Sequence, residues 1–137
     1  PKTFNQIKDV KNKYNGQIKK HQSYRQQDNT LKNTKNVIVK EFSARRNIWN
    51  FATGWGISYK DSYLKTHPAI IPVNLVIDHL ISWSNEKDLV YDPFMGSGTT
   101  AVACIRRNRN FIGSEISKEY FDLSEKRIRI ENNGGLL

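Results

Sequence analysis

A chain of 137 residues has room for one domain, and a hydrophobic fraction of 37% is low for a well-packed globule of that length. No apolar run is long enough to span a bilayer and no secretory leader is present, so we expect a soluble, intracellular protein without a membrane partner. Cys104 is the only cysteine, which excludes an internal disulfide and a thiolate zinc site.

The positive charge is concentrated at the start of the chain. Residues 1–47 contain 12 Lys and Arg against 3 acidic residues, whereas residues 48–137 contain 10 of each, so the first third holds the whole net charge of +9. Residues 1–36 are also poor in large aliphatic side chains and are predicted to form no packed core. Two interpretations stay open: an arm that neutralises nucleic-acid phosphates, or a solvated tail or loop.

Secondary structure is predicted from residue 37 onward. Residues 37–39, followed by Phe42, are typical of a short strand, and residues 48–51 of another. Gly54 and Gly56 indicate a turn or loop. We therefore divide the chain into a basic, partly low-complexity region with a connector at 1–65 and an α/β segment at 66–137.

The α/β segment is predicted to begin with a helix that Pro72 opens. One face of this helix carries apolar residues at helical spacing and should be buried: Val73, Val76, Ile77, Leu80 and Ile81.

A strand at 89–94, a helix at about 99–107 and a strand at 110–114 follow, and Ser117 is the expected N-cap of a last helix ending near 131. Two strands joined by a helix should be parallel and adjacent. The predicted fold class is α/β, a partial Rossmann-like fold with a βαβ core. Because two strands leave sheet edges and one face uncovered, we expect a missing complement.

The turn at residues 92–100 (Asp-Pro-Phe-Met-Gly-Ser-Gly-Thr-Thr) is the most informative segment. Gly96 and Gly98 permit positive φ and close approach of the backbone to a ligand, and the following helix start favours a carboxylate or phosphate. Glu115 ends the second strand, where its carboxylate would accept the hydroxyls of a ribose.

Spacing alone leaves the ligand open. Residues 96–101 fit the G-x-G-x-x-A pattern of dinucleotide sites, and Glu115 lies 17 residues after Gly98. A purely structural tight turn is the other interpretation. A P-loop is excluded because no Gly-Lys-Ser/Thr follows the glycines.

Several segments together resemble the N6-adenine and N4-cytosine DNA methyltransferases in which the cosubstrate half follows the catalytic half. Residues 92–100 match that family's cosubstrate loop, and residues 111–116 (Phe-Ile-Gly-Ser-Glu-Ile) resemble its second motif. Residues 66–72 (Thr-His-Pro-Ala-Ile-Ile-Pro) are similar to the motif before the loop, and residues 45–49 (Arg-Arg-Asn-Ile-Trp) to the end of its target-recognition region.

The resemblance covers roughly residues 45–131 and implies an S-adenosylmethionine-dependent methyltransferase fold. It implies S-adenosylmethionine as the cosubstrate, with binding residues at His67, Pro68, Ala69, Asp92, Phe94, Gly96, Gly98, Thr99, Thr100, Glu115 and Ile116.

Individual roles follow from the same resemblance. Glu115 would hold the ribose hydroxyls, Ile116 would lie against the adenine, and the loop glycines with Thr99 and Thr100 would meet the methionine end. His67, Pro68 and Ala69 would border that end; alternatively, the proline shapes a helix entry and the histidine is on the surface. The family commonly has Pro-Glu where this chain has Pro72-Val73, so no acidic contact is expected there.

The family's catalytic tetrapeptide is missing from this sequence. It consists of Asp, Ser or Asn, then Pro-Pro and an aromatic residue, whereas no two of the four prolines here are adjacent. It localises the lone pair of an exocyclic amine on an extruded base. His21, His67 and His79 show no metal-ligand spacing. We therefore assign no catalytic and no metal-binding residue.

The resemblance implies the cosubstrate-binding part of a DNA methyltransferase acting on adenine or cytosine, with DNA as a partner. A complementary N-terminal catalytic half, from the same gene or a companion chain, is also implied, and the chain alone should be inactive. The implied location is the cytoplasm of a bacterial or phage-infected cell. The alternative is an inactive or truncated fragment that serves as a nucleic-acid-binding module.

Overall fold

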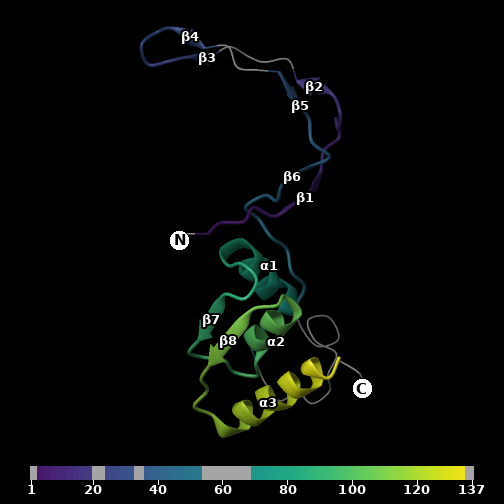
Figure 1. The fold of residues 1–137 in the computed structure, drawn as a ribbon, viewed down its shortest axis with the longest axis vertical. Coiled ribbons are helices and arrows are strands. Elements are labelled where there is room, and N and C mark those ends of the chain that lie inside the picture. Colours follow the sequence, from purple (N-terminus) through teal and green to yellow (C-terminus); the bar gives the residue numbers. More distant parts are fainter. Residues whose placement is uncertain (1–2, 20–23, 33–35, 54–68, 135–137) are drawn as a thin grey trace. The chain divides into compact units, whose positions relative to one another are not determined.

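The computed structural model describes residues 3–19, 24–32, 36–53 and 69–134, which form two compact units (Figure 1). One unit is Gln6–Ile48; the other comprises Pro1–Asn5 and Trp49–Leu137. The predicted boundary between residues 65 and 66, and the turn predicted at Gly54 and Gly56, lie outside the described residues.

The Gln6–Ile48 unit consists of three nested antiparallel strand pairs. β1 (Lys8–Lys11) pairs with β6 (Phe42–Ala44), β2 (Ile18–Lys19) with β5 (Val37–Ile38), and β3 (Tyr24–Arg25) with β4 (Leu31–Lys32). We call this unit the basic hairpin. Its innermost turn is closed by a hydrogen bond from the Gln26 N–H to the Thr30 carbonyl (2.9 Å).

In the described part of the basic hairpin, hydrogen bonding rather than a buried core holds the strands together. Ile18, Val37 and Ile38 are each more than half exposed. Asn12 donates a side-chain bond to the Lys40 carbonyl (2.8 Å), and Arg45 forms an ion pair with Asp9. None of the residues in 1–36 whose burial the structure describes is buried, in agreement with the prediction that this region forms no packed core. The sequence did not indicate β1 to β4, because main-chain ladders need no apolar periodicity.

Prediction of the two connector strands was half correct. The strand at 37–39 with Phe42 corresponds to β5 and β6, but residues 48–51 are not a strand. Trp49 instead packs its ring on His79, with ring centroids 5.4 Å apart. A strand needs a neighbour to satisfy its backbone, and among the described strands none pairs with this segment.

The second unit contains the predicted α/β elements in the predicted order. They are α1 (Val73–Trp83), β7 (Leu89–Asp92), α2 (Thr99–Arg106), β8 (Asn110–Gly113) and α3 (Lys118–Asn132). Pro72 stands at the N-cap of α1, and Ser117 caps α3 by accepting from the Tyr120 N–H (3.5 Å). β7 and β8 are parallel neighbours, as predicted.

The core lies between the helices and one face of the β7–β8 sheet. Ile77 and Leu80 of α1 meet Ala103 and Cys104 of α2. Partly buried side chains complete the cluster: Val73, Val76, Ile81, Val90 and Phe111. Small residues on α2 let the helices approach closely, and burial raises the pKa of the Cys104 thiol, consistent with an inert structural cysteine.

The opposite face of the sheet is uncovered in the described part of the chain. Leu89 and Tyr91 of β7 and Ile112 of β8 share this face and are 62%, 65% and 55% exposed. Side chains alternate between faces along a strand, so Val90 and Phe111 point to the core instead. The predicted uncovered face is therefore present.

Candidate cosubstrate site

A cleft of about 290 Å³ opens at the carboxyl ends of β7 and β8. Seven of the predicted binding residues line it: Ala69, Asp92, Phe94, Gly96, Thr99, Thr100 and Glu115. The position agrees with the general rule that open α/β sheets bind ligands outside the carboxyl ends of their strands.

The loop between β7 and α2 is built from main-chain bonds and two left-handed glycines. Gly96 and Gly98 have φ of 54° and 80°, values that L side chains rarely adopt. The Gly98 N–H donates to the Met95 carbonyl, and the Met95 N–H donates to the Ser114 carbonyl, each at 2.9 Å. The loop is thus tied to the segment after β8, and α2 begins at the cleft with its first-turn amides, which no helix can pair internally.

Asp92 joins the end of β7 to the start of α2. One carboxylate oxygen accepts from the Phe94 N–H (3.0 Å), and the other accepts from the Thr100 hydroxyl (2.6 Å). This carboxylate therefore shapes the loop as well as lining the cleft.

Glu115 connects the two loops at the sheet edge. Its Oε2 accepts from the Gly96 N–H (2.8 Å) and its Oε1 from the Ser117 N–H (2.9 Å). Hydrogen bonds to an ionised acceptor are the strong ones, so both oxygens have fixed directions before a ligand arrives.

Of the other predicted residues, Gly98 and Ile116 belong to the described part of the chain and do not line the cleft. The Ile116 side chain is fully exposed, and Gly98 is buried beneath α3. His67 and Pro68 lie outside the described residues. Phe94, although at the cleft, is 87% exposed.

Sequence reasoning missed several residues of the cleft: Ile71, Val76, Met95, Ser97 and Tyr120. Met95 and Ser97 lie inside the loop motif at residues 92–100, so their position in the motif was enough to predict that they line the cleft. It also missed Arg127, which is 5% exposed and donates to the Ser97 carbonyl (2.9 Å). The sequence feature that could have predicted this contact is a charged residue three positions after Ser124, on the face of α3 that packs against the rest of the unit.

Comparison with known proteins identifies the family. The family model described as DNA methylase matches residues 2–126. The chain belongs to the amino-type DNA methyltransferase family.

This methyltransferase chain is 49% identical over 133 residues to the orphan methyltransferase M.BamHII of Bacillus amyloliquefaciens, covering 94% of this chain and 49% of M.BamHII. It is 39% identical over 88 residues to the type II methyltransferase M.HpaI of Haemophilus parainfluenzae, covering 64% and 27% of the two chains. The chain thus spans about half the length of M.BamHII. A crystal structure of an M1.HpyAVI–SAM complex aligns with 46% of this chain and 31% of that chain, at 46% identity and a TM-score of 0.45.

The described residues of the methyltransferase chain contain neither a metal cluster nor a membrane-spanning helix. No group of three or more His, Cys, Asp or Glu side chains there has the arrangement of a metal site. None of the described helices has the length and apolar character needed to cross a membrane.

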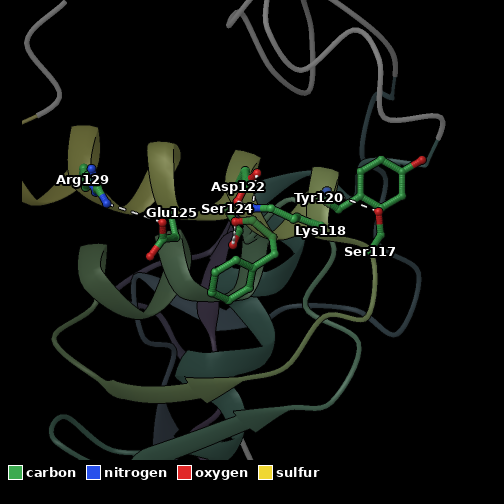
Figure 2. A network of polar contacts seen from close by, with 8 residues as sticks. Ser117, Lys118, Tyr120, Asp122, Ser124, Glu125 and Arg129 are labelled. Atoms are coloured by element: carbon green, nitrogen blue, oxygen red, sulfur yellow. Dashed lines mark hydrogen bonds and ion pairs between the residues drawn. The ribbon is translucent and has the colours of Figure 1, made fainter.

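The outer face of α3, away from the cleft, carries polar pairs along its length. Lys118 pairs with Asp122 (3.0 Å) and Arg129 with Glu125 (3.4 Å), each one helical turn apart (Figure 2). Such exposed pairs support the helix only weakly. They provide positions at which charge can be altered without touching the cleft.

The inward face of α3 explains why a glycine is needed at position 98. A Cβ there would lie 2.9 Å from the Ser124 Cβ and 3.2 Å from its Cα, and Ser124 is fully buried. The methyltransferase loop therefore requires Gly98 both for its positive φ and for the close approach of α2 to α3.

A strained φ costs about 1–3 kcal/mol. We expect Gly98→Ala to lower the free energy of unfolding by more than this, because its Cβ would also clash with Ser124. Gly134→Ala is the matched control, because Gly134 has φ of +86° with nothing within 4 Å of the added Cβ. Denaturant unfolding of both variants measures the difference. Equal losses of stability would contradict the steric role of Ser124.

Proposed function

We propose that this chain is the S-adenosylmethionine-binding part of a DNA methyltransferase that methylates an exocyclic amino group of adenine or cytosine. The observation that supports it best is the Glu115 carboxylate, which two backbone N–H groups orient at the carboxyl edge of two parallel strands. The start of α2 lines the same cleft.

The residues present fit this cosubstrate. A carboxylate oriented like Glu115 is suited to accept the two hydroxyls of a ribose. α2 begins at Thr99, so the positive end of its backbone dipole lies where the amino-acid carboxylate would lie. Ile71 and Val76 add apolar surface to the cleft. A volume of about 290 Å³ is close to the lower end of small-molecule sites, about 300–1,000 Å³.

When bound, S-adenosylmethionine supplies an electrophilic methyl group on its sulfonium sulfur. The chain's own residues would bind this cosubstrate and orient it. Asp92 holds the loop closed through the Phe94 N–H and the Thr100 hydroxyl, and Glu115 holds the Gly96 N–H. No proton transfer is assigned to any of them.

The transfer step requires groups that this sequence lacks. Attack by an exocyclic amine needs acceptors that draw on its protons, and the family places these in a Pro-Pro-aromatic tetrapeptide. We infer that an N-terminal catalytic half, from the same gene or a companion chain, supplies them. The uncovered sheet face, with Leu89, Tyr91 and Ile112 exposed, is the surface such a half would cover, and M.BamHII is about twice as long as this chain.

The basic hairpin is proposed as the DNA-binding part of the chain. A two-stranded antiparallel ribbon fits the major groove of B-DNA. Lys8, Lys11 and Lys19 lie on its strands and are exposed. Their charge would neutralise backbone phosphates, and base recognition is not assigned to any residue.

The cosubstrate proposal predicts that the chain binds S-adenosylhomocysteine and that Glu115→Ala weakens binding by at least about tenfold, the loss of two charge-assisted hydrogen bonds. Glu125→Ala, on the outer face of α3, should leave affinity unchanged. Calorimetric titration measures both. Binding of NAD but not S-adenosylhomocysteine would point to a dinucleotide site. DNA binding with no cosubstrate affinity would support the alternative of a non-enzymatic nucleic-acid-binding module.

The companion-half proposal predicts no methyl transfer to duplex DNA from this chain alone, and transfer when a catalytic half precedes it in one polypeptide. Replacing Leu89 and Ile112 together by Asp should abolish that activity, because it places charge on the covered sheet face. The same change at Lys126 and Arg129 on α3 is the control. Radiolabelled methyl incorporation is the measurement, and activity of the isolated chain would refute the inference.

The DNA proposal predicts salt-sensitive binding through the basic hairpin. Replacing Lys8, Lys11 and Lys19 by Gln should reduce the slope of log K against log salt by about 0.9 for each phosphate that the hairpin no longer neutralises. Fluorescence anisotropy of a labelled duplex measures the slope. The same three charges removed from α3 at Lys118, Lys126 and Arg129 form the control. Equal slope changes in the two triple variants would show that the hairpin is not the DNA-binding surface.

A further inference from the structure

The inward face of α3 holds the cosubstrate loop through two residues. Arg127, 5% exposed, donates from Nη1 to the Ser97 carbonyl (2.9 Å) and the Thr99 hydroxyl (3.1 Å). Ser124, three residues earlier, fills the space beside Gly98. Three successive residues, at the end of the loop and the start of α2, are therefore in contact with one helix that follows them by about 25–30 positions.

Packing alone does not account for an arginine at this position. A buried guanidinium loses its hydration, and hydrogen bonds must compensate for that loss. The Ser97 and Thr99 oxygens provide such bonds, and both residues line the cleft. A helix that needed only to cover α2 would be as stable with an apolar side chain of similar volume.

The charge of Arg127 also lies at an unusual place. It contacts Thr99, the first residue of α2, where the helix dipole is already positive. Because Arg127 donates to the Thr99 hydroxyl, its charge and the positive end of the helix dipole lie at the same end of α2, where both would stabilise a ligand carboxylate.

We propose that Arg127 is a positioning residue for the cosubstrate. It holds the Ser97–Thr99 segment in its binding shape before the ligand arrives, and it adds positive potential at the end of the cleft where the ligand's carboxylate would lie. The inference rests on the proposed function, since it names the group that orders the same site. Ordering the loop in advance reduces the conformational cost of binding.

The test compares Arg127→Met, which keeps an apolar stem and loses the donors, with Arg127→Lys, which keeps the charge and donors on a single ammonium nitrogen but loses the planar guanidinium. Arg129→Met is the matched control, because Arg129 is 77% exposed on the same helix. Ile128→Ala serves as a second control that loosens α3 without touching the loop bonds. All are made in the 137-residue chain and titrated with S-adenosylhomocysteine well below their unfolding midpoints.

We expect R127M to weaken binding by at least about tenfold and R127K to recover part of that loss, as charge-assisted bonds predict. R129M and I128A should bind like the original chain at that temperature, even if I128A unfolds earlier. Equal affinity for folded R127M and the original chain would overturn the proposal. So would a loss in I128A as large as that in R127M, because affinity would then follow stability alone.

Amide hydrogen exchange of Gly98, whose N–H donates to the Met95 carbonyl, separates this proposal from the proposed function when it is measured in the ligand-free chain. Faster exchange in R127M but not in R129M supports the positioning role even if the chain fails to bind S-adenosylhomocysteine. Unchanged exchange refutes it whatever the ligand. Should R127M fail to fold, R127K and Thr99→Val, which removes one acceptor, carry the same readouts: faster exchange and weaker binding are expected, and unchanged values in both overturn the inference.

Discussion

Glu115 and the two backbone amides that it accepts from determine the arrangement of the site. The parallel register that sets Asp92 opposite Gly113 brings the ends of β7 and β8 together, so the residues just after each strand are neighbours. Glu115 then bonds the Gly96 N–H of one loop and the Ser117 N–H of the other. Because α2 and α3 begin immediately after these loops, one carboxylate orients the starts of both helices around the same cleft.

The site is local in sequence although the fold is incomplete. β7, α2, β8 and α3 follow one another without a long connection, and they supply the loop, the carboxylate and the buried arginine. Among the described residues, only α1 and the segment directly before it add walls from outside this run, through residues such as Ala69 and Val76. A contiguous βαβα segment therefore supplies most of the candidate site, whereas its sheet still has an apolar face with nothing on it in the described part of the chain.

The basic hairpin and the α/β unit are stabilised by different interactions. Its strands are joined by backbone ladders and short polar contacts, with apolar side chains such as Ile18 and Ile38 largely in solvent. In its described residues the strands are therefore held by hydrogen bonds rather than by burial, and such bonds contribute little net stability when water competes for them. The proposed contact with DNA would supply the burial and the counter-charge that the described part of this ribbon lacks.

By itself the sequence determined the elements of the α/β unit, the parallel pairing of its strands and the family. Those signals are local: the helical period from Val73 to Ile81, the Ser117 cap, and a motif read along the chain. Only the tertiary structure decided that Gly98 packs against Ser124, that Arg127 holds the loop, that the basic region forms paired strands and that residues 48–51 do not. Each of these depends on contacts between residues far apart in sequence, and neither propensity nor periodicity encodes which partner a side chain or strand will meet.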